Sequence, residues 1–88
     1  MCPKYLKLEH LYIERLGFIC HKTNSFDISE SLIQLPYIKY DNFAWGGAIA
    51  DAFLLEKSIA VNTLCEFDGL EAIAMMVKNK MGVSLTPI

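Results

Sequence analysis

Short stretches in which apolar and polar residues alternate are spread along the whole chain. Alternation with a period of two is typical of half-buried strands. It predicts strands at Tyr5–Leu11, Ile13–Cys20, Tyr37–Tyr40, Asn62–Phe67 and Val83–Leu85. In the second of these strands, Leu16, Phe18 and Cys20 would share one side of a sheet.

Between these strands, apolar residues recur at helical spacing. The spacing predicts helices at Asp27–Leu32, at Gly47–Lys57, and from Asp68 to the neighbourhood of Lys80. Asp27 and Asp68 are each followed three residues later by a glutamate, which is a signature of a capped helix start. We therefore expect both aspartates to be N-caps.

Strands and helices alternate through the second half of the sequence, and no internal repeat or linker interrupts it. This order is typical of α/β domains, in which parallel strands are joined by helices that cover both faces of the sheet. At 88 residues the chain has room for one small domain. The sequence therefore predicts a single α/β domain with parallel pairing and helices on both faces.

The composition is apolar for a small domain. Apolar residues make up 53% and charged residues 20% of the chain, against about 45–50% and about 25% in typical soluble domains. A chain of this length buries only roughly 60% of its surface on folding, so it cannot hide all of these side chains. We expect an exposed apolar face that meets a partner or a missing domain. The alternative is a small domain that is simply rich in apolar residues.

The charge argues against direct nucleic-acid binding. The net charge is −2, and the cations are scattered along the sequence, whereas nucleic-acid-binding domains cluster lysine and arginine. The densest pair, Lys78 and Lys80, falls at a predicted helix end, where cations complement the helix dipole.

Cysteine usage and hydropathy predict a soluble protein of the cytoplasm. Cys2, Cys20 and Cys65 lack metal-ligand spacing, so we expect free thiols and neither a disulfide framework nor a metal site. Charged residues interrupt the N-terminus before a signal peptide could form. The longest apolar region, Phe43–Leu55, contains Asp51 and is too short to span a membrane.

Two stretches of the chain resemble the effector-binding domain of LysR-type transcriptional regulators. Leu35–Asp41, with the sequence LPYIKYD, is similar to a strand of that family with the pattern LPFIRYD. Phe67–Val77 followed by Gly82–Pro87 is similar to the family's acidic helix cap, helix, glycine-rich turn and strand closing in proline. The order and spacing of the two stretches also match, so the resemblance extends over Leu8–Pro87.

The chain departs from the family pattern at one turn. The family usually has Gly-x-Gly where this chain has Lys80-Met81-Gly82, and the first glycine is a left-handed cap at the helix end. A residue with a side chain is disfavoured in that conformation. We therefore expect a changed helix exit or a cap shifted to Gly82.

The resemblance implies one lobe of a type II periplasmic-binding-protein-like domain, a three-layer α/β/α sandwich. Residues 1–88 would match only the second lobe and would contain no DNA-binding domain. The implied partners are the first lobe and the winged helix-turn-helix domain of an intact regulator, a second copy of the chain, and a small-molecule effector, commonly an organic acid. No cofactor is implied. The implied function is effector sensing and dimerisation in a LysR-type regulator.

Two loops of this lobe would face the effector cleft. Each follows a strand and opens a helix, where free backbone N–H groups and the helix dipole suit an anionic group. The candidate effector-binding residues in these loops are Asn42, Phe43, Ala44, Trp45, Gly46, Asp68 and Gly69. Phe43 and Trp45 could equally be core residues beneath their loop, and Asp68 a helix cap without ligand contact. The dimer contacts that the resemblance implies are Ala48, Ala52, Leu55, Thr63 and Cys65.

The residues do not favour catalysis. His10 and His21 have no serine or cysteine partner in a recognisable nucleophile motif, and Cys20 and His21, adjacent on a strand, would point to opposite faces. We therefore expect a binding module and no enzyme. The alternative is a lobe of a periplasmic solute-binding protein of a transport system, which shares the fold. Redox sensing through Cys20 and Cys65 is disfavoured because both look buried in strands.

Overall fold

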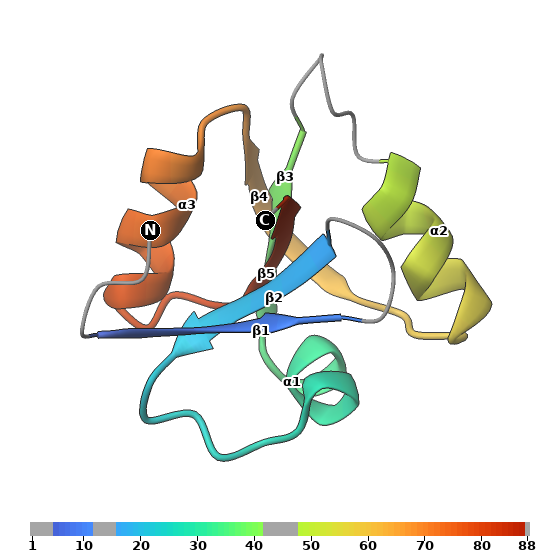
Figure 1. Ribbon diagram of the computed structural model, residues 1–88, viewed down its shortest axis with the longest axis horizontal. Coiled ribbons are helices and arrows are strands. Elements are labelled where there is room, and N and C mark those ends of the chain that lie inside the picture. Colours follow the sequence, from blue (N-terminus) through green and yellow to red (C-terminus); the bar gives the residue numbers. More distant parts are fainter. Residues whose placement is uncertain (1–4, 12–15, 42–47, 88) are drawn as a thin grey trace.

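The computed structural model describes residues 5–11, 16–41 and 48–87 (Figure 1). The elements follow one another in the order β1 (Leu6–His10), β2 (Leu16–His21), α1 (Ile28–Gln34), β3 (Pro36–Tyr40), α2 (Ala48–Glu56), β4 (Asn62–Phe67), α3 (Leu70–Lys78) and β5 (Ser84–Pro87). Each element corresponds to a predicted one, and β4 has the predicted bounds. The part of the second predicted strand that precedes Leu16 lies largely outside the described residues.

The strands form two sheets. β1, β2 and β5 make a three-stranded antiparallel sheet, in which Leu6 is opposite His21 and Leu16 is opposite Pro87. β3 and β4 form a parallel pair. Parallel pairing is therefore confirmed for β3 and β4, whereas β1–β2 and β2–β5 are antiparallel. Residues 11–15 alone join β1 to β2, and a parallel crossover needs about a dozen residues or more.

The two sheets meet where β5 begins. The N–H of Ile38 donates to the carbonyl of Val83 at 2.8 Å, and the N–H of Val83 donates to the carbonyl of Pro36 at 2.9 Å. The buried hydroxyl of Ser84 donates to the carbonyl of Ile38. These bonds make a short parallel bridge between β3 and the start of β5, so β3 lies against both β4 and β5.

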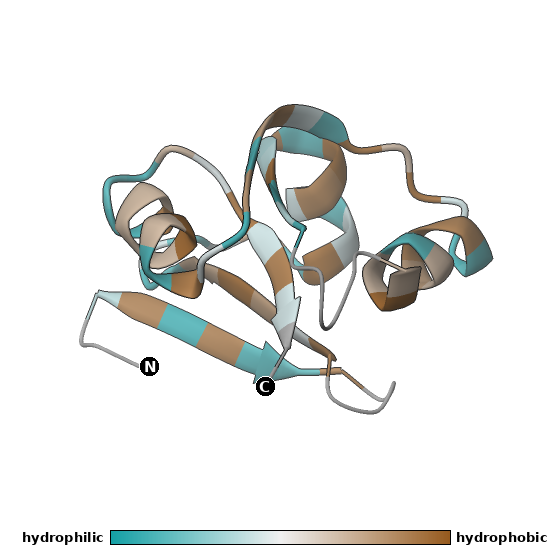
Figure 2. Ribbon diagram, turned by 90° about the horizontal axis from the view of Figure 1, so that it is seen from above, coloured by the Kyte–Doolittle hydropathy of each residue, from teal (hydrophilic) through white to brown (hydrophobic). Residues whose placement is uncertain are grey.

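Helices cover both faces of these strands (Figures 1 and 2). Along β2, Leu16, Phe18 and Cys20 belong to one core cluster and Ile19 to the other, because successive strand residues point to opposite faces. The first cluster contains the buried apolar residues of α1 and α2, and the second contains Ile73 and Val77 of α3. The predicted α/β class and the predicted sharing of one side by Leu16, Phe18 and Cys20 are confirmed.

The helix starts agree with the sequence in one case and differ in the other. Asp27 is the N-cap of α1, and its Oδ1 accepts a hydrogen bond from the N–H of Glu30 at 2.7 Å. The N-cap of α3 is Gly69 and not Asp68, which was expected there. The capping-box prediction for Asp68 is wrong by one residue, because glycine also serves well as an N-cap.

α3 ends in a Schellman turn built on a lysine. Lys80 has φ +61°, its N–H donates to the carbonyl of Val77 at 3.0 Å, and the N–H of Met81 donates to the carbonyl of Met76 at 2.9 Å. The expected change of exit, or shift of the cap to Gly82, is therefore wrong. Lys80 itself takes the left-handed conformation that a glycine usually holds.

We expect Lys80→Gly to raise the free energy of unfolding by about 0.5–1 kcal/mol, since glycine holds positive φ without steric cost. α2 ends in the same way, with φ +56° at Ser58 and a hydrogen bond from the N–H of Ile59 to the carbonyl of Leu54 at 2.9 Å. Ser58→Gly should therefore have a similar effect in urea denaturation. Lys80→Ala keeps the Cβ and should give no gain; an equal gain from alanine would rule out the conformational explanation.

Candidate functional site

The candidate site lies at the edge where β3 and β4 end. Tyr40 and Phe67 are the last residues of the two parallel strands and are paired in register. The N–H of Asp41 donates to the carbonyl of Phe67 at 2.9 Å, which extends this pairing beyond β3. Each strand leads to the start of a helix. The two strand ends that lead into the predicted cleft loops therefore lie side by side.

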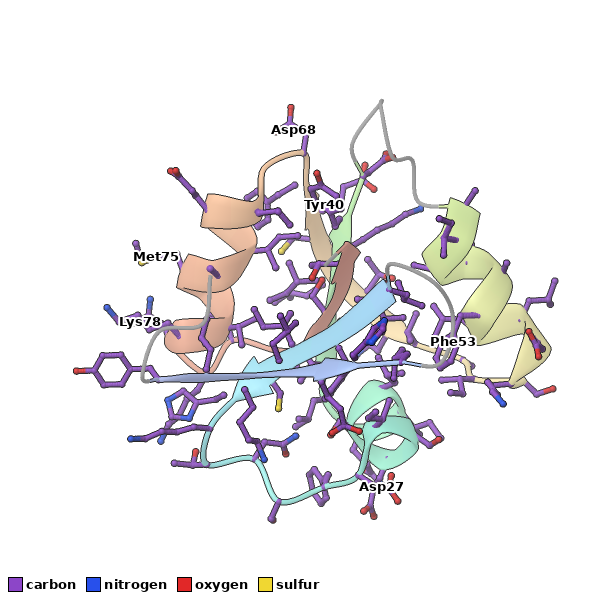
Figure 3. All side chains as sticks on the ribbon, in the orientation of Figure 1. Asp27, Tyr40, Phe53, Asp68, Met75 and Lys78 are labelled. Carbon is purple, nitrogen blue, oxygen red and sulfur yellow. The ribbon has the colours of Figure 1, made fainter. Side chains whose placement is uncertain are left out.

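Of the predicted effector-binding residues, the structure places Asp68 and Gly69. The side chain of Asp68 is exposed at the turn between β4 and α3 and points outward (Figure 3). A Cβ built on Gly69 would meet nothing within 4 Å, so glycine is not needed there for packing. The other predicted effector-binding residues lie outside the described residues: Asn42, Phe43, Ala44, Trp45 and Gly46.

The electrostatics of this edge are mixed. Asp41 and Asp68 carry exposed carboxylates beside the two loops. Lys39 of β3 lies 3.9 Å from the Oδ2 of Asp51 in the first turn of α2, and its side chain is 31% exposed. Beneath the edge, Tyr40 is buried in the core shared with α3. Binding of an anionic group at this edge would depend on Lys39 and on the free N–H groups at the starts of α2 and α3.

The predicted dimer contacts lie on two elements. Ala48, Ala52 and Leu55 follow one another at helical spacing on α2 and are exposed, Leu55 by 82%. On β4, Thr63 is exposed and Cys65 is half-buried. Since β4 pairs with β3 alone among the described strands, its other edge is open to solvent or to a partner.

Exposed apolar side chains are present on several elements: Tyr5, Phe26, Ile33, Leu55, Leu64, Met75 and Met81. The prediction of an exposed apolar face that meets a partner stays a prediction. α2 has apolar residues on both sides, because Ala50, Phe53 and Leu54 are buried while Leu55 is exposed.

Two cysteines and two histidines lie in the described part of the chain. Cys20 is buried and Cys65 is half-buried, and both are free thiols. Cys65 was expected to be buried and is not, because β4 is an edge strand. The Nδ1 of His21 lies 2.8 Å from the hydroxyl of Thr23. The described residues contain no group of three or more His, Cys, Asp or Glu side chains that could hold a metal ion.

Three lysines from distant parts of the sequence, Lys22, Lys78 and Lys80, lie close to Tyr5 or His21 in the structure. The amino groups of Lys22 and Lys78 lie 5.9 and 5.0 Å from the centre of the Tyr5 ring. Lys22 and Lys80 are close enough to His21 to lower the pKa of its imidazole, after the larger effect of desolvation. Sequence reasoning missed this group because its members come from the β1–β2 hairpin and from the end of α3, more than fifty positions apart.

Among the described residues, none of the helices has the length and apolar character needed to cross a membrane. No family model matches the chain, and neither a curated protein nor a solved structure matches it.

Proposed function

We propose that this chain is the second lobe of the effector-binding domain of a LysR-type transcriptional regulator, with a type II periplasmic-binding-protein-like, three-layer fold. In this role it senses a small organic anion and contributes to dimerisation, and it catalyses no reaction. The observation that carries the proposal is the parallel pair β3–β4, whose carboxyl ends lead side by side into two helix starts. In open α/β sheets, ligands bind at such an edge.

The effector would lie between this edge and the first lobe of the intact regulator. Backbone N–H groups at the starts of α2 and α3 would receive its carboxylate, and Lys39, 3.9 Å from Asp51 in the first turn of α2, would add a positive charge. Binding that is tighter in the closed arrangement of the lobes would shift the population toward closure. Closure would then alter the DNA occupancy of the separate winged helix-turn-helix domain.

The site can be tested by an amide NMR titration of the chain with succinate and with benzoate at constant ionic strength. We expect saturable shifts confined to residues 41–47 and 68–71, with weak affinity because one lobe supplies half of a cleft. Sodium chloride at equal ionic strength should leave these amides unchanged. Shifts elsewhere, or no saturable shift with either acid, would contradict the proposed effector site.

Dimerisation through α2 and β4 makes a second prediction. Leu55→Asp should convert a dimer into a monomer in light scattering, because it places a charge in a contact that would otherwise bury an apolar side chain. Leu55 is 82% exposed, so the fold should keep its stability within about 0.5 kcal/mol.

Met75→Asp is the matched control, since Met75 is 59% exposed on α3, on the other side of the molecule from α2 (Figure 3). This variant should remain a dimer. A Leu55→Asp protein with the mass of the wild-type dimer would exclude the α2 surface as the contact.

A further inference from the structure

A basic cluster lies at the end of the molecule remote from the β3–β4 edge, and we define it as Tyr5, His21, Lys22, Lys78 and Lys80. Tyr5 precedes β1, His21 ends β2 and Lys22 follows it. Lys78 lies in the last turn of α3 (Figure 3), and Lys80 follows that helix. The hydrogen bond from the N–H of Lys22 to the carbonyl of Tyr5, at 2.9 Å, fixes the two strands at this point. The chain as a whole carries a net charge of −2, so this concentration of cations runs against its overall charge.

A cavity of about 150 Å³ opens beside the cluster. Its polar lining comes from His21, Thr23, Asn24 and Lys80, and its apolar lining from Leu35, Pro36 and Val83. Pockets for drug-sized ligands measure about 300–1,000 Å³, so this one has room for a single anionic group and not for a whole ligand of that size. Any remaining part of a ligand would extend over the surface.

The polar groups of the cavity are already oriented. The N–H of Thr23 donates to Nδ1 of His21 at 3.1 Å, so Nδ1 is an acceptor and the neutral ring carries its proton on Nε2. The side chain of Asn24 is held by two bonds, from its Nδ2 to the hydroxyl of Ser31 at 2.8 Å and from the N–H of Phe26 to its Oδ1 at 3.3 Å. Nε2 of His21 and the ammonium group of Lys80 therefore remain as donors.

The cations of the cluster are not neutralised within the described residues. No described carboxylate forms an ion pair with Lys22, Lys78 or Lys80; Glu71 lines a neighbouring groove with Lys78, without such a pair. Like charges held together repel one another, and a bound anion relieves that repulsion. Desolvation and the ammonium groups of Lys80 and Lys22 lower the pKa of His21 below its ordinary value, so at pH 7.5 it acts as a neutral donor.

We propose that the cavity beside the basic cluster binds a terminal phosphate group of a small ligand, with Lys80 and His21 in contact with its oxygens. Lys22 and Lys78, whose amino groups lie over the Tyr5 ring, raise the local positive potential and attract the dianion. A dianion matches several unpaired cations better than a monoanionic carboxylate does. This site and the proposed effector edge lie at opposite ends of β3, so an experiment can contradict one proposal and leave the other standing.

The probe is inorganic phosphate, added to the ¹⁵N-labelled chain at pH 7.5 and constant ionic strength. We expect saturable amide shifts in residues 21–24 and 80–83, with a Kd in the millimolar range. Lys80→Gln should weaken binding about tenfold, since it removes one charge-assisted hydrogen bond. Lys57→Gln removes the same charge outside the cluster and should change the Kd less than twofold.

Lys80→Gly separates binding from stability, because it should stabilise the turn while it weakens phosphate binding as much as Lys80→Gln does. Phosphate shifts that do not saturate, or a Kd that is equal in the Lys80→Gln and Lys57→Gln variants, would overturn the proposal.

Acetate should bind at least tenfold more weakly than phosphate. Equal binding of the two would show a site for any anion and would overturn the proposal. A single-stranded oligonucleotide without terminal phosphates should not compete, and binding of that phosphodiester in preference to phosphate would also overturn it.

Discussion

Replacing Gly82 by alanine should lower the free energy of unfolding by about 3 kcal/mol. Gly82 is buried between the end of α3 and the start of β5. A Cβ at this position would collide with the carbonyl oxygen of Pro36 and lie 3.1 Å from its carbonyl carbon. The same carbonyl accepts the N–H of Val83, so the collision falls on the hydrogen bonds that join β3 to β5. Backbone cannot move aside as a flexible side chain can.

Urea denaturation followed by circular dichroism measures this loss. Gly69→Ala is the matched control, because a Cβ there meets nothing within 4 Å. Its cost should be limited to about 0.5–1 kcal/mol for the loss of a favourable N-cap residue. If Gly82→Ala costs no more than Gly69→Ala, the close approach of the two backbones does not contribute to stability.

The positions of the helices and strands could be predicted from the sequence, but the pairing of the strands could not. Alternation located β4 at its observed bounds, and helical spacing located α2, because each pattern is local. Pairing is decided by connections: the short link between β1 and β2 requires a hairpin, although the alternation of strands and helices favoured parallel strands. The comparison with the family pattern also gave a wrong prediction at Lys80. This residue was expected to shift the C-terminal cap of α3, but it takes the left-handed cap conformation itself.

One of the two candidate sites could be predicted from the sequence and the other could not. That the carboxyl ends of β3 and β4 lie side by side followed from parallel pairing, because parallel strands end at the same edge. The basic cluster could not be found by the same reasoning, because Lys22 and Lys78 are joined only through packing around Tyr5. A local pattern holds no information on contacts between a hairpin and a helix end that are far apart in sequence.

The free energy of unfolding should fall in alkaline solution because the phenol of Tyr37 is buried. Its side chain is 2% exposed in the core beneath α2. Burial raises the pKa of its phenol well above the ordinary value of 10.0, the carboxylate of Asp51 raises it further, and a backbone hydrogen bond with Leu85 acts in the opposite direction. The folded state therefore holds a proton that the unfolded chain releases above pH 10.

Since the folded pKa is the higher one, the stability linked to this proton is complete below pH 10 and is lost as the pH rises. The loss should reach about 1.4 kcal/mol at pH 11 and about twice that at pH 12. Tyr37→Phe removes the ionisable group and costs about 1 kcal/mol at pH 7 through its lost hydrogen bond. Its free energy of unfolding should then fall less steeply, so that the variant overtakes the wild type between pH 10 and pH 12. Parallel pH profiles in urea denaturation would show that Tyr37 ionises in the folded state as readily as in the unfolded chain.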